Sequence, residues 1–159
     1  MAPANSRRAS SINARLTNDH SASSSHLTAP CPPLLSRYIN AYFKELIDGI
    51  FHHSGDVIKF AGDAMQVVWR NRRGSSDSLA QLITRASVCC LDILRRLNNF
   101  APVDGVVLRL HMGVGGGTLS AFYVGGYAGK WEYFVAGEPI EQMSDATEEA
   151  THGQPVLSS

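Results

Sequence analysis

Two charged side chains, the carboxylate of Asp63 and the ammonium of Lys59, lie close together in a largely apolar stretch, SGDVIKFAGDAMQVVWR. Residues 57–61 and 64–69 are rich in apolar and β-branched residues, as half-buried strands are. Gly62 and Asp63 alone separate these runs, and a Gly-Asp pair indicates a tight hairpin, because glycine readily adopts the positive φ that such turns require. The pattern therefore predicts a β-hairpin that holds one carboxylate at its rigid tip.

Both residues also have ordinary structural interpretations. Aspartate is favoured in turns because its side chain hydrogen bonds to its own backbone. Lys59 could extend its ammonium out of the sheet while its stem packs on it. Residue type alone leaves both interpretations open, so the whole string has to be considered.

The string DVIKFAGDAM, followed by an apolar strand, resembles the metal-binding hairpin of class III nucleotide cyclases, and most closely the first catalytic half of soluble adenylyl cyclases. Two later segments are similar to the same family in the same order, HMGVGGG (111–117) and EYFVAGEPI (132–140). The resemblance extends over residues 34–159. It implies an α+β, ferredoxin-like nucleotide cyclase fold, with an antiparallel sheet and helices on one face.

The resemblance also implies an activity. In this family the tip aspartate is one of two carboxylates that hold two divalent ions on the phosphates of the nucleotide. The chain is therefore expected to be a half-domain of an adenylate cyclase, which converts ATP to cyclic AMP and pyrophosphate in intracellular signalling. Asp63 would be the catalytic and metal-binding residue, with Mg²⁺ or Mn²⁺ as the ions, and Lys59 and Gly62 would bind the substrate.

The second carboxylate of the family is not found in this sequence. It normally comes from the first strand, in a motif like Phe-x-Asp-Ile-x-Gly-Phe, which does not occur here. Asp48 falls in a predicted helix, and Asp104 is followed by Gly-Val. We therefore expect the first strand to be missing, and one carboxylate rarely organises two magnesium ions, which prefer several oxygen ligands.

The family's sites lie between two cyclase domains packed head to tail, and several positions depart from its pattern. Phe134 stands where the second base-reading residue is expected, and Glu141 and Asp145 stand where Asn and Arg stabilise the transition state. An aspartate there would repel the phosphates, by roughly 1 kcal/mol at 4 Å even in water.

We therefore expect a homodimer to be inactive or very weak, and a complementary second cyclase domain to be the partner. The alternative is a catalytically inactive pseudo-cyclase that acts as a dimerisation or regulatory binding module.

The elements that position these residues follow from periodicity and turn signals. In the first part of the chain we expect a helix over 34–51, the hairpin strands, and a helix that is capped by Ser76 or Asp77 and runs to Leu97. A strand over 106–114, a glycine turn at 115–117 and strands over 119–124 and 131–136 follow. The chain then forms a helix from Glu138 to Gly153 and a strand at 156–157. One strand placed before this order completes a β-α-β-β-α-β core.

The first 33 residues differ in composition from the rest. They contain seven serines and three arginines but one acidic residue, Asp19, and they lack apolar periodicity. Disorder is the expectation, and this composition also fits an organellar transit peptide. The predicted organisation is therefore a disordered or targeting segment, 1–33, followed by a partial cyclase domain, 34–159.

Composition excludes several other classes. Lys plus Arg and Asp plus Glu are both 14 in 159 residues, so no broad basic field exists for nucleic acid or an anionic membrane. RNA-recognition modules need paired aromatics within such a field. No apolar run approaches the roughly 18 residues of a membrane span.

The cysteine count bears on the compartment. Three cysteines, two of them adjacent, form no disulfide or zinc framework, which predicts a reducing, cytoplasmic location. Cys89 and Cys90 are expected in the core, and His111 is expected to be an ordinary strand histidine.

Overall fold

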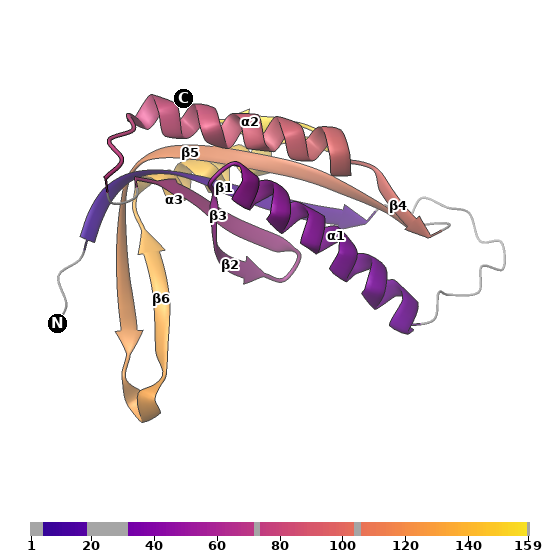
Figure 1. Cartoon of the computed structure of the whole chain (residues 1–159), viewed down its shortest axis with the longest axis horizontal. Helices are drawn as coiled ribbons and strands as arrows, with labels where there is room; N and C mark the ends of the chain where they lie inside the picture. Colours follow the sequence, from indigo (N-terminus) through magenta and orange to yellow (C-terminus); the bar gives the residue numbers. More distant parts are fainter. Residues whose placement is uncertain (1–4, 19–31, 72–73, 104–105, 159) are drawn as a thin grey trace.

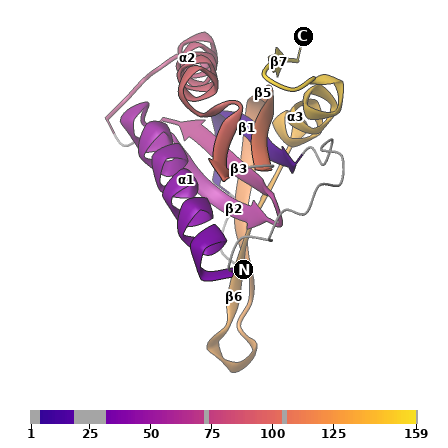
Figure 2. The same ribbon diagram turned by 90° about the vertical axis from the view of Figure 1, so that its right-hand side faces the viewer.

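One sheet organises the computed structural model, which describes residues 5–18, 32–71, 74–103 and 106–158 (Figures 1 and 2). The strands are β1 (Asn5–Asn18), β2 (Asp56–Ala61), β3 (Ala64–Arg70), β4 (Phe100–Val103), β5 (Val106–Gly125), β6 (Trp131–Ala136) and β7 (Pro155–Leu157). The helices are α1 (Pro32–His52), α2 (Leu79–Leu97) and α3 (Glu138–Glu149), with a short 3-10 turn, η1 (Tyr127–Gly129). The sheet runs in the order β2-β3-β1-β5-β4, and β6 and β7 also pair with β5. The predicted α+β class is confirmed; the pairings are antiparallel except for β7 with β5.

The first strand of the fold is present, as β1, at the centre of the sheet. It pairs with β3 from residue 9 to residue 15 and with β5 along its whole length. The expectation of a missing first strand is therefore wrong, as is disorder for residues 5–18. Residues 1–4 and 19–31, with the targeting prediction that rests on them, lie outside the described residues.

Strand β1 was not recognised in the sequence, and those of its residues whose burial is described are small. Ala9, Ser10 and Ala14 are buried, and none of them belongs to the β-branched or aromatic types that mark a strand. A central strand gains backbone hydrogen bonds from two neighbours, so pairing can hold a segment whose own propensity is weak.

Helices α1 and α2 cover one face of the sheet and enclose the main core. Alternate residues of β3 and β5 enter this core together with α1 and α2; they include Met65, Val67, Trp69, Leu110, Met112 and Val114. The remaining alternate residues of these strands point to the opposite face, because side chains alternate along a strand. Cys89 and Cys90 lie in this core as expected, and burial raises the pKa of the Cys89 thiol to about 12.

Helix α3 lies on the face opposite α1 and α2. A Cβ atom placed on Gly113 or Gly115 would collide with the backbone of α3, whereas one placed on Gly116 would come 2.6 Å from Ile83 Cδ1 of α2. The expectation of helices on one face therefore holds for α1 and α2, and α3 is the exception.

The same glycines explain why β5 is longer than expected. A turn at 115–117 was predicted, but β5 continues through these residues for 20 residues in all. The glycines allow helices to approach the strand closely on both faces, so they reflect packing rather than chain reversal. The prediction of a turn at this position is wrong.

Element ends differ slightly from the expected ones. Ser78, rather than Ser76 or Asp77, caps α2: its Oγ accepts a hydrogen bond from Gln81 N, and Gln81 Oε1 accepts one from Ser78 N. Helix α3 ends at Glu149, before the predicted stop at Gly153. The short strand β4 was not foreseen, because it contains Pro102, a residue type rarely found inside sheets.

Tyr42 of α1 places a polar group in the core without compensation. Its side chain is 1% exposed, and its hydroxyl finds no hydrogen-bond partner among the described residues. Burial raises the pKa of this phenol well above its ordinary value. The hydroxyl is therefore expected to destabilise the fold, because its hydration is lost and not replaced.

Replacing Tyr42 by phenylalanine should stabilise the protein, because the ring contacts stay and the unpaired hydroxyl goes. We expect the free energy of unfolding to rise by about 1 kcal/mol, measured by urea denaturation. Tyr38→Phe, at a half-buried position of the same helix, is the matched control and should change little. A lower midpoint for the Tyr42 variant would show that the hydroxyl has a partner.

An ion-pair cluster joins the C-terminal ends of α1 and α2. Asp92 Oδ2 lies 3.2 Å from His53 Nε2 and 3.0 Å from Arg96 Nη2. The hydrogen bond with His53, followed by the charge of Arg96, holds the pKa of the Asp92 carboxyl below its usual range. Because the folded pKa is lowered, the cluster stabilises the fold above the unfolded pKa of about 4 and loses that effect as the pH falls through the folded value.

Asp92→Asn should therefore reduce stability at pH 7 by up to about 1 kcal/mol, since Asp92 is partly exposed. The difference from the unchanged protein should begin to shrink as the pH falls below about 4, the unfolded pKa, and should disappear once the pH passes the lowered folded pKa and Asp92 is protonated in both states. Urea midpoints recorded between pH 3 and pH 7 test this. Asp48→Asn, which removes an exposed ion pair with Lys44 on α1, is the control, and equal pH profiles of the two variants would contradict the assignment.

Candidate functional site

The hairpin of β2 and β3 presents Asp63 as the sequence predicts. Ala61 pairs with Ala64, and Gly62 and Asp63 form the connection between them. Gly62 has a φ of 63°, and a Cβ there would meet nothing within 4 Å, so glycine is required by backbone conformation rather than by space. Asp63 is exposed at the tip, and its carboxylate faces solvent in the single chain.

Lys59 belongs to the face that α1 and α2 leave uncovered. It pairs with Gln66, which lies between two residues that enter the core, Met65 and Val67. Paired residues of an antiparallel ladder share a face, so Lys59 and Gln66 lie opposite the helical layer. We call this side of β1, β2, β3 and β5 the open face.

A β-bulge enlarges the open face next to Lys59. The register shifts between Val57 and Lys59, which leaves Ile58 as the extra residue. Val57 packs against the main core, whereas Ile58 packs against the apolar cluster of the open face. The bulge thus places two consecutive residues, Ile58 and Lys59, on the same side, which a regular strand would not do.

A small apolar cluster lines the open face. Its buried members are Ala9, Val68 and Leu119, and Ile58 and Ile140 pack against them. Ile140 belongs to α3, so this helix borders the cluster. Apolar side chains of four strands and one helix therefore meet on the face that carries Lys59.

An arm made of the distal half of β5 and of β6 projects from the body of the molecule, as both views show (Figures 1 and 2). Its exposed aromatic residues are Phe122, Tyr123, Tyr127, Trp131, Tyr133 and Phe134. Phe122 and Phe134 stack with ring centroids 6.1 Å apart. An exposed aromatic surface of this kind is typical of protein interfaces. Sequence analysis predicted both strands but not this surface, although the density of aromatics over 122–134 could have indicated it.

The described residues do not form a site for two metal ions. Among them, no group of three or more His, Cys, Asp or Glu side chains is placed to hold an ion. Strand β1 passes beside β3, yet its sequence NSRRASSINARLTN contains no Asp or Glu. Asn13 occupies the register position opposite Gln66, in the row that also contains Lys59. Asp63 is thus a single carboxylate, and the expected second ligand is absent from the strand that the family uses.

Other positions singled out by the sequence are spread around this region. Phe134 lies on the arm, stacked on Phe122. Glu141 and Asp145 are exposed on α3, one turn apart. His111 is buried on β5 with its ring centroid 5.9 Å from that of His152, as suits a strand histidine. None of the described helices is long and apolar enough to cross a membrane.

The amino-acid sequence is similar to that of known adenylate cyclases. No protein-family model matches the chain. Adenylate cyclase type 10 of human and of rabbit are each 25% identical to it over 124 residues, which is 78% of this chain. The matched segment is 8% of either relative, so the chain spans less than a tenth of their length.

Solved structures give the fold. The adenylyl cyclase CyaB of P. aeruginosa superposes with a TM-score of 0.74 at 15% identity, over 98% of this chain and 79% of that one. The guanylyl cyclase Cya2 gives 0.68 at 21% identity, over 97% and 76%. The dimeric guanylyl cyclase domain of the RhoGC fusion protein from the fungus Blastocladiella emersonii gives 0.72 at 15% identity, over 98% and 81%. The chain has the fold of class III nucleotide cyclase domains, and its sequence resembles soluble adenylate cyclase.

Proposed function

We propose that this chain is a half-domain of an adenylate cyclase, which converts ATP to cyclic AMP and pyrophosphate at an interface with a second cyclase domain. The observation that carries the proposal is Asp63, exposed at the tip of a hairpin whose sheet carries Lys59 and an apolar cluster on its open face; the aromatic arm extends from the opposite end of that sheet. Such an arrangement is incomplete without a partner. The proposed setting is the cytoplasm and intracellular signalling, as the sequence resemblance implies.

The roles of the hairpin residues follow from their places. Asp63 is proposed to act on the phosphate side of the nucleotide, and Lys59 and Gly62 are proposed to bind the substrate. Lys59 stands on the open face with Gln66, so its ammonium is available to the nucleobase or phosphates of a molecule held there. The preference for ATP rests on the resemblance to adenylate cyclase type 10.

Electrostatics favour a different domain, rather than a second copy, as the partner. Glu141 and Asp145 are exposed on α3, and a second copy would bring the same two carboxylates toward a triphosphate. Each would oppose binding by roughly 1 kcal/mol at 4 Å, even with the screening of water. A productive partner should instead supply cationic or amide side chains, which stabilise the charge that develops on the phosphates.

Any metal ions would need further ligands from residues other than the described ones, on a partner domain or elsewhere in the protein. Two Mg²⁺ or Mn²⁺ ions are expected from the resemblance, but the described chain offers one suitable carboxylate at the hairpin. We therefore assign no step of the reaction to a metal held by this chain alone. In this proposal the chain contributes the hairpin that positions Asp63, the open face that binds the nucleotide, and the aromatic arm that contacts the partner.

A pseudo-cyclase is the second candidate, and a specific observation favours it. Strand β1 lies where the family places its other carboxylate, and it has none. A domain that has lost this ligand could keep the aromatic arm and the open face as a dimerisation module. Turnover by the paired protein separates the two candidates.

Pairing the chain with the complementary second half-domain of a soluble adenylyl cyclase should give Mn²⁺-dependent synthesis of cyclic AMP from ATP. Asp63→Ala should reduce that rate about 100-fold or more, while Asp48→Ala, an exposed carboxylate on α1, should leave it within about twofold. Product is measured by chromatography, and pairing by size exclusion. Stable pairing without product, unaffected by Asp63→Ala, would favour the pseudo-cyclase and reject the enzyme.

Asn13→Asp should raise the activity of the paired protein, by at least about tenfold, because it places a carboxylate on β1 at the register of Gln66. Asn40→Asp, the same chemical change on the exposed side of α1, is the control and should have no effect. Mn²⁺ dependence of the rate should shift to lower ion concentrations in the Asn13 variant. If the rate and this dependence both stay unchanged, the second ligand comes from elsewhere.

A further inference from the structure

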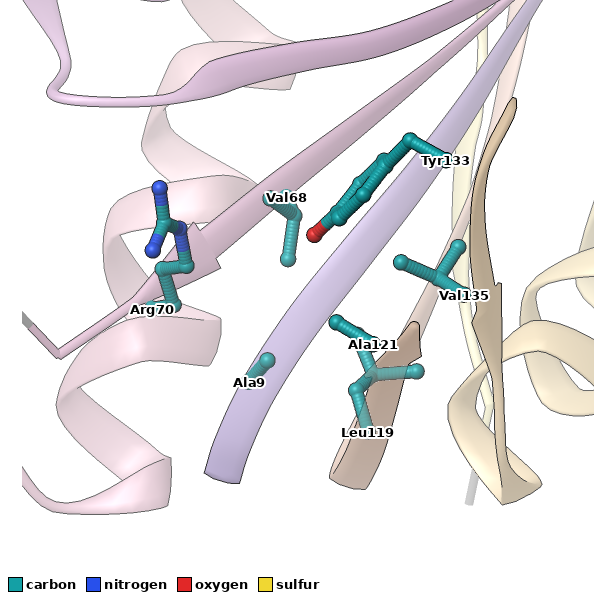
Figure 3. Close-up of a pocket in the computed structure, with 7 residues that line it drawn as sticks. All are labelled: Ala9, Val68, Arg70, Leu119, Ala121, Tyr133 and Val135. Carbon is teal, nitrogen blue, oxygen red and sulfur yellow. The ribbon is translucent and has the colours of Figure 1, made fainter. Parts of the chain in front are cut away.

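A pocket opens on the open face at the root of the arm (Figure 3). It encloses about 80 Å³, and its walls come from four strands, β1, β3, β5 and β6. The floor is Ala9, Val68 and Leu119, each at most 5% exposed. Val135 and Ala121 complete the apolar wall. The pocket lies along β3 from the hairpin tip, near the opposite end of that strand, so it is separate from Asp63.

Small residues create this hollow. Ala9 and Ala121 stand on neighbouring strands, where larger apolar side chains would fill the space with their own atoms. Closely packed interiors rarely leave such space. The pocket has room for roughly three non-hydrogen atoms below its opening, given that one water takes about 30 Å³ in the liquid.

Two polar groups stand at the edge of this apolar pocket. The ring of Tyr133 lies across it with its hydroxyl directed toward Val68, and Arg70 lies beside Val68 (Figure 3). Arg70 Nη2 donates a hydrogen bond to Asp56 Oδ2, 3.0 Å away. A guanidinium has five N–H donors, so this bond fixes the position of Arg70 and occupies one of them. The Arg70 side chain is 49% exposed, which leaves it accessible from solvent.

We propose that this pocket binds a small monocarboxylate with a short branched apolar body, such as isovalerate. The apolar body would cover Val68 and Leu119, and the carboxylate would accept hydrogen bonds from Arg70 and from the Tyr133 hydroxyl. Hydrogen-bond donors at the edge of an apolar hollow select this class: among the described lining residues, Arg70 has N–H donors beyond the one bonded to Asp56, and Tyr133 adds a hydroxyl, which together match one carboxylate on a few carbons. Neutral apolar molecules would leave Arg70 unused, and acetate would leave the hollow unfilled.

The affinity should be modest because Arg70 is half exposed. An exposed ion pair is weak, and few carbons are buried, so a dissociation constant of about 1 mM is expected. This inference goes beyond the proposed function and does not depend on it. It concerns the chain without nucleotide or partner.

Titration of the full chain with isovalerate, followed by NMR, tests the proposal. We expect saturable shifts of the backbone amides of Ala9, Val68 and Leu119. Acetate, which lacks the apolar body, and isoamyl alcohol, which lacks the charge, should each bind at least about fivefold more weakly. If acetate binds as tightly as isovalerate, the apolar pocket contributes nothing and the proposal is overturned. If isoamyl alcohol binds as tightly, the carboxylate contributes nothing and the proposal is likewise overturned.

Two variants remove the two halves of the site separately. Arg70→Gln should weaken isovalerate binding at least about tenfold, and Ala121→Leu should abolish it by filling the hollow while keeping the charge. Arg85→Gln is the matched control, because Arg85 is also paired with an aspartate, Asp77, but lies outside the pocket. Unchanged binding in either pocket variant would overturn the proposal, and Ala121→Leu remains decisive if Arg70→Gln disturbs the fold.

Protein docking on the same surface is the competing outcome. If isovalerate gives no saturable shifts, and Ala121→Leu weakens pairing with a second cyclase domain, the pocket is part of a protein interface and the ligand proposal is wrong. Because ligand binding is measured on the single chain without nucleotide, its failure leaves the cyclase assay unaffected. Failure of the cyclase assay likewise leaves the titration interpretable.

Discussion

Backbone pairing of β1 with both β3 and β5 is the constraint on which the rest of the structure depends. Without β1, the hairpin that carries Asp63 and the long strand β5 would have no shared sheet. Its register with each neighbour decides which residues share a face, because a shift of one residue would exchange the core face and the open face. Ala14 pairs with Met65 on one side and with Met112 on the other, and all three enter the main core. The open face is therefore fixed by the same pairing that closes the core.

The sequence predicts those elements whose own residues carry the signal. The hairpin has apolar runs around a Gly-Asp turn, and α2 has an apolar stripe, so both were found nearly to the residue. Strand β1 was missed because its sequence is mostly small and polar, and its pairing with two neighbouring strands is not visible in the sequence. Gly115 and Gly116 led to the wrong prediction of a turn for a related reason. Glycine permits both turns and close helix packing, and only the positions of α2 and α3 in the structure show that packing is its use here.

The candidate site shows a similar division between local and distant signals. Asp63 and Lys59 were recognised from one continuous string, and the hairpin places both as expected. The open face was not foreseen, since it requires residues of β1, β3, β5 and α3 to meet. The bulge at Ile58 is likewise a property of pairing, because nothing in the sequence of β2 marks where an extra residue will be accommodated.

The two faces of the sheet argue for a shared rather than a self-contained site. The helical face is covered by α1 and α2 and holds the large apolar residues of the main core. The open face carries Lys59 and an apolar cluster, while the aromatic arm projects beyond it into solvent. A single chain gains nothing by leaving six aromatic residues on an arm in water, since their burial is strongly favourable. Together with a hairpin carboxylate that has no acidic residue beside it on β1, this exposed aromatic surface is the feature from which the proposal of a partner domain is argued.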